Sequence, residues 1–263
     1  MVIIQPSGGL CNRMRVINSS LELAKRKNTK LLVLWYCADE LNAPFESLFL
    51  PTKEFQVINF KSLKDLRKLW YQLTSRTRIN NEDIENHTTD GTLDQDYFNS
   101  IRLPAYLFTW EHFYPADEYF RLFRPTAALQ ERIDAVTEHF TKDMVSVHIR
   151  RTDQINSIAY SKTENFIELM NREIEENPDV RFFLATDDKD EEALLRKTFP
   201  GRIVSNENRT LRRDSLDGMY DALLDLYCLA ACKKIIGSYC SSFTDTAAAL
   251  GNIPKLIAGV DQP

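Results

Sequence analysis

MVSVHIRRTD, residues 144–153, carries more information about fold and function than any other stretch of this chain. Its apolar first half is typical of a buried strand, and the strand ends in His148, Arg150, Arg151 and Asp153. A guanidinium group donates two parallel hydrogen bonds and therefore suits a phosphate or a carboxylate. Two interpretations are open on these residues alone: an anion-binding site, with a diphosphate as the favoured ligand, or solvated arginines that pair with Asp153.

Composition narrows the class of protein. The 263 residues are 43% apolar, which is enough for one large domain or two smaller ones. The net charge of −5 and the lack of a long basic stretch argue against a nucleic-acid partner. Five cysteines without a C-x-x-C motif favour a reduced compartment over a disulfide framework.

No run of 18 apolar residues occurs, so we expect no membrane-spanning helix. The first residues lack the basic region of a secretory signal and enter a strand at once. We therefore expect a cytoplasmic protein.

The first half of the chain predicts a β-α-β unit, with a strand at 2–5, an amphipathic helix at 14–27 and a strand at 30–36. The turn between the first two contains Gly8 and Gly9. Backbone N–H groups at such a turn, together with the partial positive charge of the helix start, favour an anionic ligand. Because the turn matches no established phosphate-binding motif, an ordinary tight turn is the alternative.

The rest of the first half is expected to contain a strand at 55–60, a helix at 63–73, a polar, acidic and unstructured loop at 80–96, a strand at 105–110 and a helix at 127–140. We place a domain boundary after the last helix, near Lys142.

The second half alternates between the two kinds of element. Strands are predicted at 144–149, 181–185, 202–205, 234–237 and 254–258, and helices at 161–177, 190–199, 216–232 and 244–250. Such alternation indicates a parallel sheet with helices on both faces, whose ligands bind beyond the carboxyl ends of the strands. Polar clusters at 148–153, 186–188 and 238–242 all follow strands, so we expect them to meet at that edge.

Several of these side chains have a structural alternative. His148 suits a ligand contact or a satisfied position in the core. Ser161 with Glu164, and Ser242 with Asp245, have the spacing of helix capping boxes, although the second pair also suits a phosphate at a helix N-terminus.

Asp225 lies among leucines and needs a partner, which a ligand hydroxyl, an arginine or solvent would supply. The D-x-D patterns at 94–96 and 188–190 are expected by chance in a chain so rich in aspartate, and no other set of metal ligands stands out. We therefore expect no metal site.

The order of motifs resembles one known family. HIRRTD at 148–153 resembles the arginine motif of the metal-independent GT-B fucosyltransferases, which include core α1,6-fucosyltransferases, bacterial nodulation fucosyltransferases and, more distantly, protein O-fucosyltransferases. The segments with similar counterparts in these enzymes are GGLCNRM at 8–14, FLATDD at 183–188, LLDLYCLA at 223–230 and GSYCSSF at 237–243. The resemblance is specific over about 140–250 and absent between about 40 and 140.

The resemblance implies an α/β protein of the GT-B-like class, with two Rossmann-like parallel-sheet domains and the active site in the cleft. Residues 1–142 would form an N-terminal α/β domain on the acceptor side. Residues 143–263 would form the domain that binds the nucleotide sugar GDP-fucose.

The resemblance also assigns roles to residues. Arg150 and Arg151 would hold the diphosphate, with Arg150 the catalytic group, and Asp225 would contact the sugar nucleotide. The remaining donor-binding residues would be Gly9, Asn12, His148, Asp187, Asp188, Ser241, Ser242 and Phe243.

The sequence departs from the family after the arginine motif. The α1,6 enzymes carry a lysine and a glutamate where this chain has Gln154 and Ile158. No catalytic base follows from the pattern: either Asp153 serves, or the enzyme relies on stabilising the leaving group.

The expected activity is an inverting, metal-independent transfer of fucose from GDP-fucose to a glycan hydroxyl, with no cofactor. The alternatives are a GT-B glycosyltransferase with another nucleotide sugar, a non-catalytic nucleotide-sugar-binding protein and, less favoured, a metal-dependent D-x-D transferase. The compact chain suggests a bacterial enzyme of polysaccharide biosynthesis, with peripheral membrane association as an open question. The glycan acceptor is not defined by the sequence.

Overall fold

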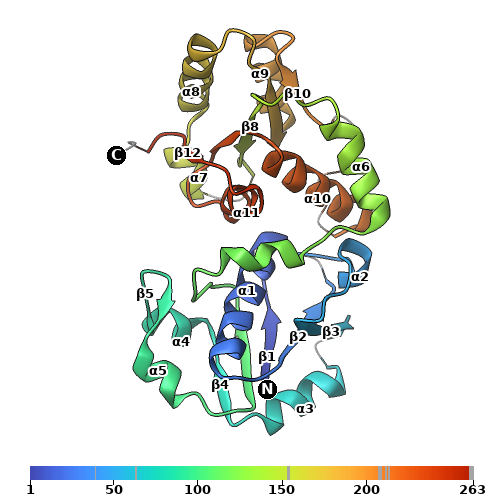
Figure 1. Cartoon of the computed structure of the whole chain (residues 1–263), viewed down its shortest axis with the longest axis vertical. Coiled ribbons are helices and arrows are strands. Elements are labelled where there is room, and N and C mark those ends of the chain that lie inside the picture. Colours follow the sequence, from blue (N-terminus) through green and yellow to red (C-terminus); the bar gives the residue numbers. More distant parts are fainter. Residues whose placement is uncertain are drawn as a thin grey trace. The chain divides into compact units, whose positions relative to one another are not determined.

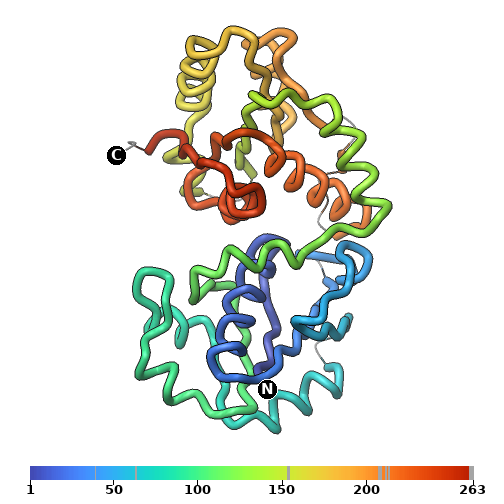
Figure 2. The backbone as a smooth tube through the Cα atoms, in the orientation of Figure 1, coloured from blue at the N-terminus to red at the C-terminus, as the bar shows by residue number. Residues whose placement is uncertain are grey.

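The computed structural model describes the chain except for residues 39, 63, 153, 154, 207, 208, 211, 213 and 261–263. It divides into two compact units (Figures 1 and 2). The first comprises Met1–Thr126 and Arg212–Met219, and the second comprises Ala127–Leu211 and Tyr220–Pro263. None of the helices in the described part of the chain combines the length and the apolar character needed to cross a bilayer.

The first unit is built on a five-stranded parallel sheet in the order β3-β2-β1-β7-β4. Its elements are β1 (Val2–Pro6), α1 (Leu10–Arg26), β2 (Leu31–Tyr36), α2 (Phe45–Leu48), β3 (Phe55–Phe60), α3 (Leu66–Thr74), β4 (Thr77–Ile79), α4 (Asn81–Asn86), β5 (Thr88–Thr89), β6 (Thr92–Leu93), α5 (Gln95–Ser100), β7 (Ala105–Thr109) and the 3-10 helix η1 (Asp117–Leu122). Strand β1 is buried along its whole length, as expected for a parallel strand that is covered on both faces. The predicted β-α-β unit is confirmed.

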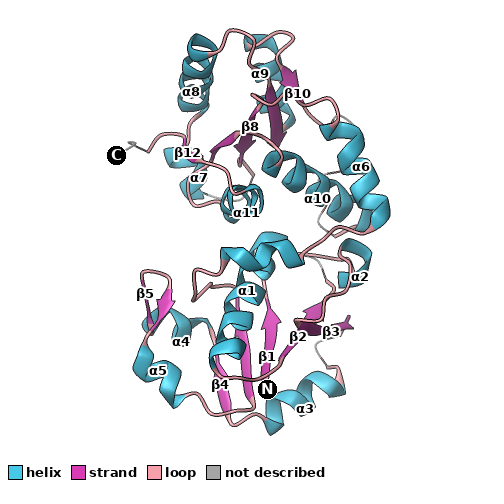
Figure 3. Cartoon of the chain, viewed as in Figure 1, coloured by secondary structure: helices cyan, strands magenta, loops and turns pink. Residues whose placement is uncertain are grey.

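The second unit is a second five-stranded parallel sheet, in the order β10-β9-β8-β11-β12, with its helices around it (Figure 3). Its elements are α6 (Ala127–Thr137), β8 (Val145–Ile149), α7 (Ile155–Tyr160), α8 (Thr163–Glu176), β9 (Phe182–Thr186), α9 (Lys189–Thr198), β10 (Ile203–Val204), α10 (Leu216–Ala230, which belongs to this unit from Tyr220 onward), β11 (Lys234–Gly237), α11 (Ser242–Gly251) and β12 (Lys255–Ile257). Phe166 and Met170 of α8 are fully buried in a core shared with β8 and β9. Most predicted elements of this half are present, but α7 was not predicted.

The stretch at 80–96 is ordered, and the prediction of an unstructured loop is wrong. Asn80 and Asp83 form a reciprocal capping box that starts α4, with N···O distances of 2.8 and 3.0 Å. Asp90 and Gly91 have positive φ values of 50° and 72° in the turn of the β5–β6 hairpin. Caps and a glycine turn order this segment despite its acidic composition.

The expected capping box at the start of α8 is also absent. Lys162 occupies the N-cap position and makes no side-chain capping bond. The Ser161 hydroxyl instead donates to the carbonyl of Ala258 at 2.6 Å. This hydroxyl therefore connects the start of α8 to the segment after β12 rather than capping its own helix.

The division between the units differs from the expected boundary near Lys142. Helix α6 belongs to the second unit, where Arg132 forms a 2.6 Å ion pair with Asp221 of α10. The segment Arg212–Met219 belongs to the first unit, where the Asn42 side chain donates to the carbonyl of Asp214 at 3.0 Å. These pairings join residues far apart in sequence, so a linear reading of the chain does not reveal them.

Candidate functional site

Three polar clusters of the second unit meet at one edge of its sheet. Strand β8 lies between β9 and β11, with Ile149 paired to Thr186 and His148 paired to Gly237. All three strands run parallel, so the residues that follow them emerge at the same edge. The structure thus brings together the clusters that the sequence predicted to meet.

Arg150 is the first residue after β8. Its backbone N–H donates to the Ser238 hydroxyl at 3.0 Å, and its Nη1 lies 2.9 Å from Oδ2 of Asp187. The side chain is 19% exposed. These contacts hold the guanidinium at the sheet edge and leave part of it accessible to an anionic ligand.

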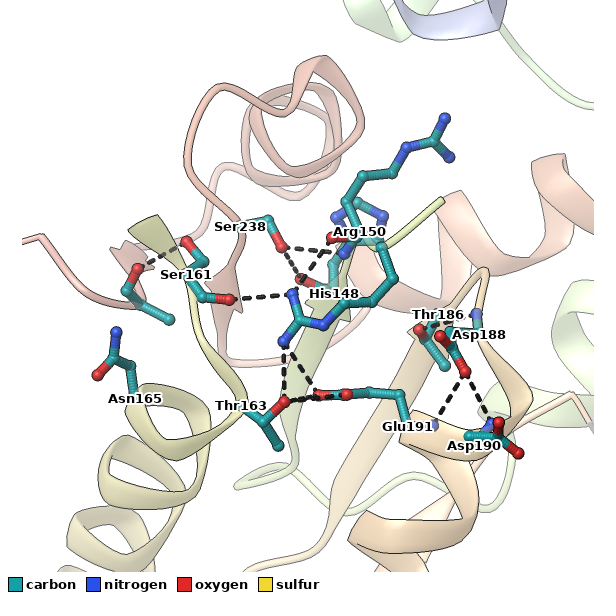
Figure 4. Close-up of polar contacts among 12 residues, drawn as sticks. His148, Arg150, Ser161, Thr163, Asn165, Thr186, Asp188, Asp190, Glu191 and Ser238 are labelled. Carbon is teal, nitrogen blue, oxygen red and sulfur yellow. Dashed lines mark hydrogen bonds and ion pairs between the residues drawn. The ribbon is translucent and has the colours of Figure 1, made fainter. Parts of the chain in front are cut away.

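Arg151 has a different environment. Its guanidinium donates to the carbonyl of Ser161 at 2.9 Å, to Thr163 Oγ1 at 3.2 Å and to Glu191 Oε1 at 3.1 Å. Figure 4 shows Thr163 and Glu191 joined by hydrogen bonds next to Ser161. The resemblance predicted that both arginines hold the diphosphate, with Arg150 the catalytic group, whereas in the structure the Arg151 guanidinium binds groups of the protein itself.

Asp187 organises the loop after β8. In addition to the ion pair with Arg150, it accepts the backbone N–H of Arg151 at 2.8 Å and the hydroxyl of Thr152 at 2.7 Å. A carboxylate that accepts several hydrogen bonds fixes the groups that donate them. Asp187 therefore defines the direction in which the chain leaves the sheet.

Asp188 has a separate role at the start of α9. Its carboxylate is the N-cap and accepts the backbone N–H groups of Asp190 at 2.8 Å and Glu191 at 3.1 Å. The first aspartate of the D-x-D pattern at 188–190 is thus a helix cap. Across the described ranges of the chain, no three His, Cys, Asp or Glu side chains are grouped so that they could hold a metal ion.

His148 is buried between β8 and α11. Its Nδ1 lies 2.8 Å from the hydroxyl of Thr244, and its ring stacks on Phe243 with centroids 4.9 Å apart. Burial, reinforced by the charge of Arg150, lowers the pKa of His148 to about 3, so the ring is neutral at pH 7. A neutral imidazole that packs against Phe243 positions the start of α11.

The N-terminus of α11 lies at the same edge. Ser241 is the N-cap and accepts the backbone N–H of Thr244 at 3.5 Å. The expected capping by Ser242 with Asp245 is wrong by one residue, because the helix begins at Ser242 itself. The N–H groups of Ser242 and Phe243 have no acceptor within the helix and carry the positive end of its dipole.

Asp225 has a buried partner that sequence analysis missed. Arg209 is almost fully buried and donates to the carbonyl of Thr186 at 2.8 Å and to Glu192 at 2.9 Å. Its Nε lies 4.0 Å from Oδ2 of Asp225, whose Oδ1 has no hydrogen-bond partner among the described residues. Burial outweighs the charge of Arg209 and raises the pKa of Asp225 to about 7.

No local pattern distinguishes Arg209 from the other arginines of its loop. Its contact with the Thr186 carbonyl, however, places the Asp225 cluster at the carboxyl end of β9, next to Asp187. Arg209 is therefore an addition to the predicted site residues.

The glycine turn of the first unit is held by Arg13, which was also not predicted as a site residue. Gly8 has φ +78°, and Gly9 is the N-cap of α1. The buried Arg13 side chain donates to the carbonyl of Gly8 at 2.7 Å and to that of Tyr36 at 2.5 Å. Asn12 lies against Gly8: a Cβ on Gly8 would be 3.0 Å from its Nδ2. The turn is thus fixed by the side chain of the helix that follows it.

The candidate base Asp153 lies outside the described residues, and so does Gln154, one of the two positions at which the sequence departs from the α1,6 enzymes. Ile158 lies in α7 and is exposed, and as an apolar side chain it cannot accept a proton. No base is therefore assigned.

A comparison with protein-family models finds no match to this sequence, and neither does a comparison with curated proteins. Solved fucosyltransferase structures are similar in fold. NodZ alpha-1,6-fucosyltransferase co-crystallized with GDP has a TM-score of 0.65 at 19% identity, covering 100% of this chain and 95% of that chain. Fucosyltransferase NodZ from Bradyrhizobium has a TM-score of 0.61 at 18% identity, with 94% and 92% covered. POFUT1 in complex with GDP-fucose has a TM-score of 0.59 at 11% identity, with 99% and 97% covered.

These similarities establish the fold. The chain has the two-domain, Rossmann-like GT-B fold seen in the NodZ and POFUT1 fucosyltransferases. The expectation of this fold from the sequence is confirmed.

Proposed function

We propose that this protein is an inverting, metal-independent glycosyltransferase that moves fucose from GDP-fucose to a hydroxyl of a glycan. The observation that carries the proposal is the geometry of Arg150 at the carboxyl edge of the sheet: Asp187 pairs with its partly exposed guanidinium, and the Ser238 hydroxyl accepts its backbone N–H. The structural relatives lend support, since NodZ and POFUT1 were each solved with GDP and with GDP-fucose.

The chemistry follows from the charge that develops during transfer. The bond between the anomeric carbon and the diphosphate oxygen breaks while the oxygen of an acceptor hydroxyl attacks from the opposite side, which inverts the anomeric centre. With no base assigned among the described residues, the hydroxyl proton passes to the departing GDP or to solvent. Negative charge accumulates on the leaving GDP. Arg150 and the first N–H groups of α11 are the donors that stabilise this charge, a contribution typically worth about 10²–10³ in rate per donor. Ser241, Ser242 and Phe243 line this part of the site.

The other residues position these donors or bind the nucleotide. Asp187 and Arg151 hold the loop that carries Arg150, and His148 supports Phe243. The free Oδ1 of Asp225 accepts a hydrogen bond from an N–H or O–H group of the nucleotide. A buried acceptor without a partner gains more from such a bond than an exposed one, because it is already desolvated.

Calorimetric titration of the purified protein with GDP, UDP, ADP and GDP-fucose, with and without EDTA, tests the proposal. We expect selective binding of GDP and GDP-fucose that is unchanged by EDTA. Arg150→Ala should weaken GDP binding by about 10²-fold, the loss of roughly two charge-assisted hydrogen bonds.

Arg172→Ala is the matched control, because it removes an exposed guanidinium on α8. It should bind like the unmodified protein. A preference for UDP or ADP would discard GDP-fucose as the donor, and loss of binding in EDTA would discard the metal-independent mechanism. If Arg150→Ala bound GDP as tightly as the control, the role of Arg150 would be wrong.

Turnover separates an enzyme from a binding protein. Release of GDP from GDP-fucose in the presence of a glycan mixture is expected for the unmodified protein and reduced for Arg150→Ala. Tight binding without any turnover would overturn the assignment as an enzyme.

A further inference from the structure

Helix α3 carries an apolar stripe that faces solvent. It joins β3 to β4, the two edge strands of the first sheet, and none of its residues is buried (Figure 1). The exposed apolar side chains are Leu66 (80% exposed), Leu69 (39%), Trp70 (59%) and Leu73 (74%). Their spacing of i, i+3, i+4 and i+7 places all four within an arc of about 100° on one side of the helix.

The opposite side of α3 faces the sheet. Tyr71 packs against the core cluster formed by Ile3, Leu32, Leu34, Phe60 and Tyr106. The strand register puts these residues on one face of the sheet. An amphipathic helix ordinarily turns its apolar stripe toward the core, whereas α3 turns it away. Solvation of this stripe is unfavourable, which points to an apolar environment that covers it.

The charge around the stripe is strongly positive. Residues 61–78 contain six lysines and arginines and one aspartate, a formal charge of +5 in a chain whose net charge is −5. The exposed cations Lys61 and Lys64 precede the helix, and Arg76 and Arg78 follow it. The aspartate, Asp65, is the N-cap and pairs with Arg67 at 2.7 Å. A cationic rim thus flanks the stripe at both ends.

We propose that α3 docks this protein on an anionic lipid bilayer surface. The leucines and Trp70 would enter the boundary between headgroups and acyl chains, while the flanking lysines and arginines contact lipid phosphates. Tryptophan favours this boundary because its ring is apolar and its N–H is polar. The proposal concerns where the protein works, so it stands independently of the donor.

A second copy of the chain fits the stripe less well. A symmetric contact would bring α3 against α3 and oppose two segments of charge +5. Four side chains on nine residues also form a small patch for a stable dimer, which typically buries about 800 Å² per partner. Lipid phosphates, by contrast, supply the negative charge that the rim lacks.

Vesicle flotation tests the proposal. Full-length protein is mixed with vesicles of phosphatidylcholine alone or of phosphatidylcholine with phosphatidylglycerol. We expect flotation with the anionic vesicles and at least tenfold weaker binding to the neutral ones, since each basic residue near an anionic surface strengthens binding. Equal binding to both would refute the role of the rim, and binding to neither would refute docking.

Paired variants localise the effect. Trp70→Ser with Leu73→Ser should reduce binding at least tenfold, whereas Trp110→Ser with Leu194→Ser changes two side chains that are exposed elsewhere and should not. Likewise, Lys64→Glu with Arg76→Glu should abolish flotation. Its matched control is the exposed pair Lys162→Glu with Lys197→Glu, which makes the same change in net charge and should retain flotation.

A measurement on the intact stripe guards against misfolded variants. In Trp110→Phe protein the remaining tryptophans are the buried Trp35 and the exposed Trp70, so a spectral change on lipid addition reports Trp70. We expect a blue shift and quenching by brominated acyl chains. An unchanged spectrum in the presence of anionic vesicles would overturn the proposal. A second result would also overturn the proposal. This is the observation, by light scattering without lipid, of a dimer that the double variant Trp70→Ser with Leu73→Ser converts to monomer.

Discussion

Replacing Arg151 by methionine tests whether Arg151 stabilises the fold while the adjacent Arg150 binds the ligand. Arg151 and Glu191 are nearly buried, 11% and 9% exposed, and lie 3.1 Å apart. Removing the guanidinium leaves the Glu191 carboxylate desolvated without its cation and deprives the Ser161 carbonyl of a donor. Breaking a buried ion pair from one side typically costs about 3–5 kcal/mol. For a chain of this size, that corresponds to a Tm lower by roughly 10 °C.

Two further variants separate stability from ligand binding. Arg151→Met combined with Glu191→Gln removes the uncompensated charge but keeps an acceptor for the Thr163 hydroxyl, so it should recover much of the lost stability. Arg172→Met removes one partner of an exposed ion pair with Glu168 and should change the stability by less than about 1 kcal/mol.

Urea unfolding followed by circular dichroism measures the stability, and calorimetry on the same samples measures GDP binding. If Arg151 positions the loop, the double variant regains GDP affinity together with stability. The reasoning is refuted if the double variant is stable yet binds GDP about 10²-fold more weakly, because Arg151 would then contact the diphosphate itself.

Two further predictions concern stability. Gly237→Ala should destabilise the protein by roughly 1–3 kcal/mol, because a Cβ there would lie 2.0 Å from the Thr244 methyl group, and urea unfolding measures this loss. Thr244→Ser should recover only part of the loss, because it removes the methyl group but keeps the hydroxyl oxygen, which would lie 2.5 Å from the added Cβ. An unchanged midpoint would contradict the close packing. The second prediction concerns Asp225, whose pKa is raised by burial to about 7. The folded protein therefore keeps a proton on Asp225 that the unfolded chain loses near pH 4. The free energy of unfolding should fall as the pH rises from about 4 to 7. Asp225→Asn should therefore increase the free energy of unfolding in urea more at pH 8 than at pH 5. The control is Asp179→Asn, which changes an exposed aspartate and should not show this difference. Equal effects of Asp225→Asn at both pH values would count against a buried, protonated Asp225.

The fold class was readable because it depends on local patterns. Strand and helix periodicity alternate along the second half, and parallel strands joined by helices must end at one edge of the sheet. The meeting of the clusters that follow β8, β9 and β11 is a consequence of this rule. The order of residues 80–96 was also predictable, because the Asn80–Asp83 cap and the Asp90-Gly91 turn are local patterns. The acidic composition of the segment led instead to the prediction of an unstructured loop.

The roles of individual side chains depend on distant residues. Arg150 and Arg151 are neighbours with the same chemistry, yet Asp187 holds the first and Glu191, 40 positions away, pairs with the second. The pairing of Arg209 with Asp225 likewise joins a loop to a helix across the unit. A motif names the residue types at a site, but only the packing of separate elements decides which of them remains accessible to a ligand.

Helix α3 is a second case in which local sequence is not sufficient, because here the pattern is clear but the face that is buried is not. The spacing of Leu66, Leu69, Trp70 and Leu73 determines an apolar stripe, and the surrounding lysines and arginines determine a positive charge, from the sequence alone. Whether that stripe faces the core depends on which side of the helix the sheet accepts, and Tyr71 occupies that side. Periodicity specifies that a helix has two faces, whereas the choice of the buried face is made by the complementary surface it meets, which only the tertiary structure contains.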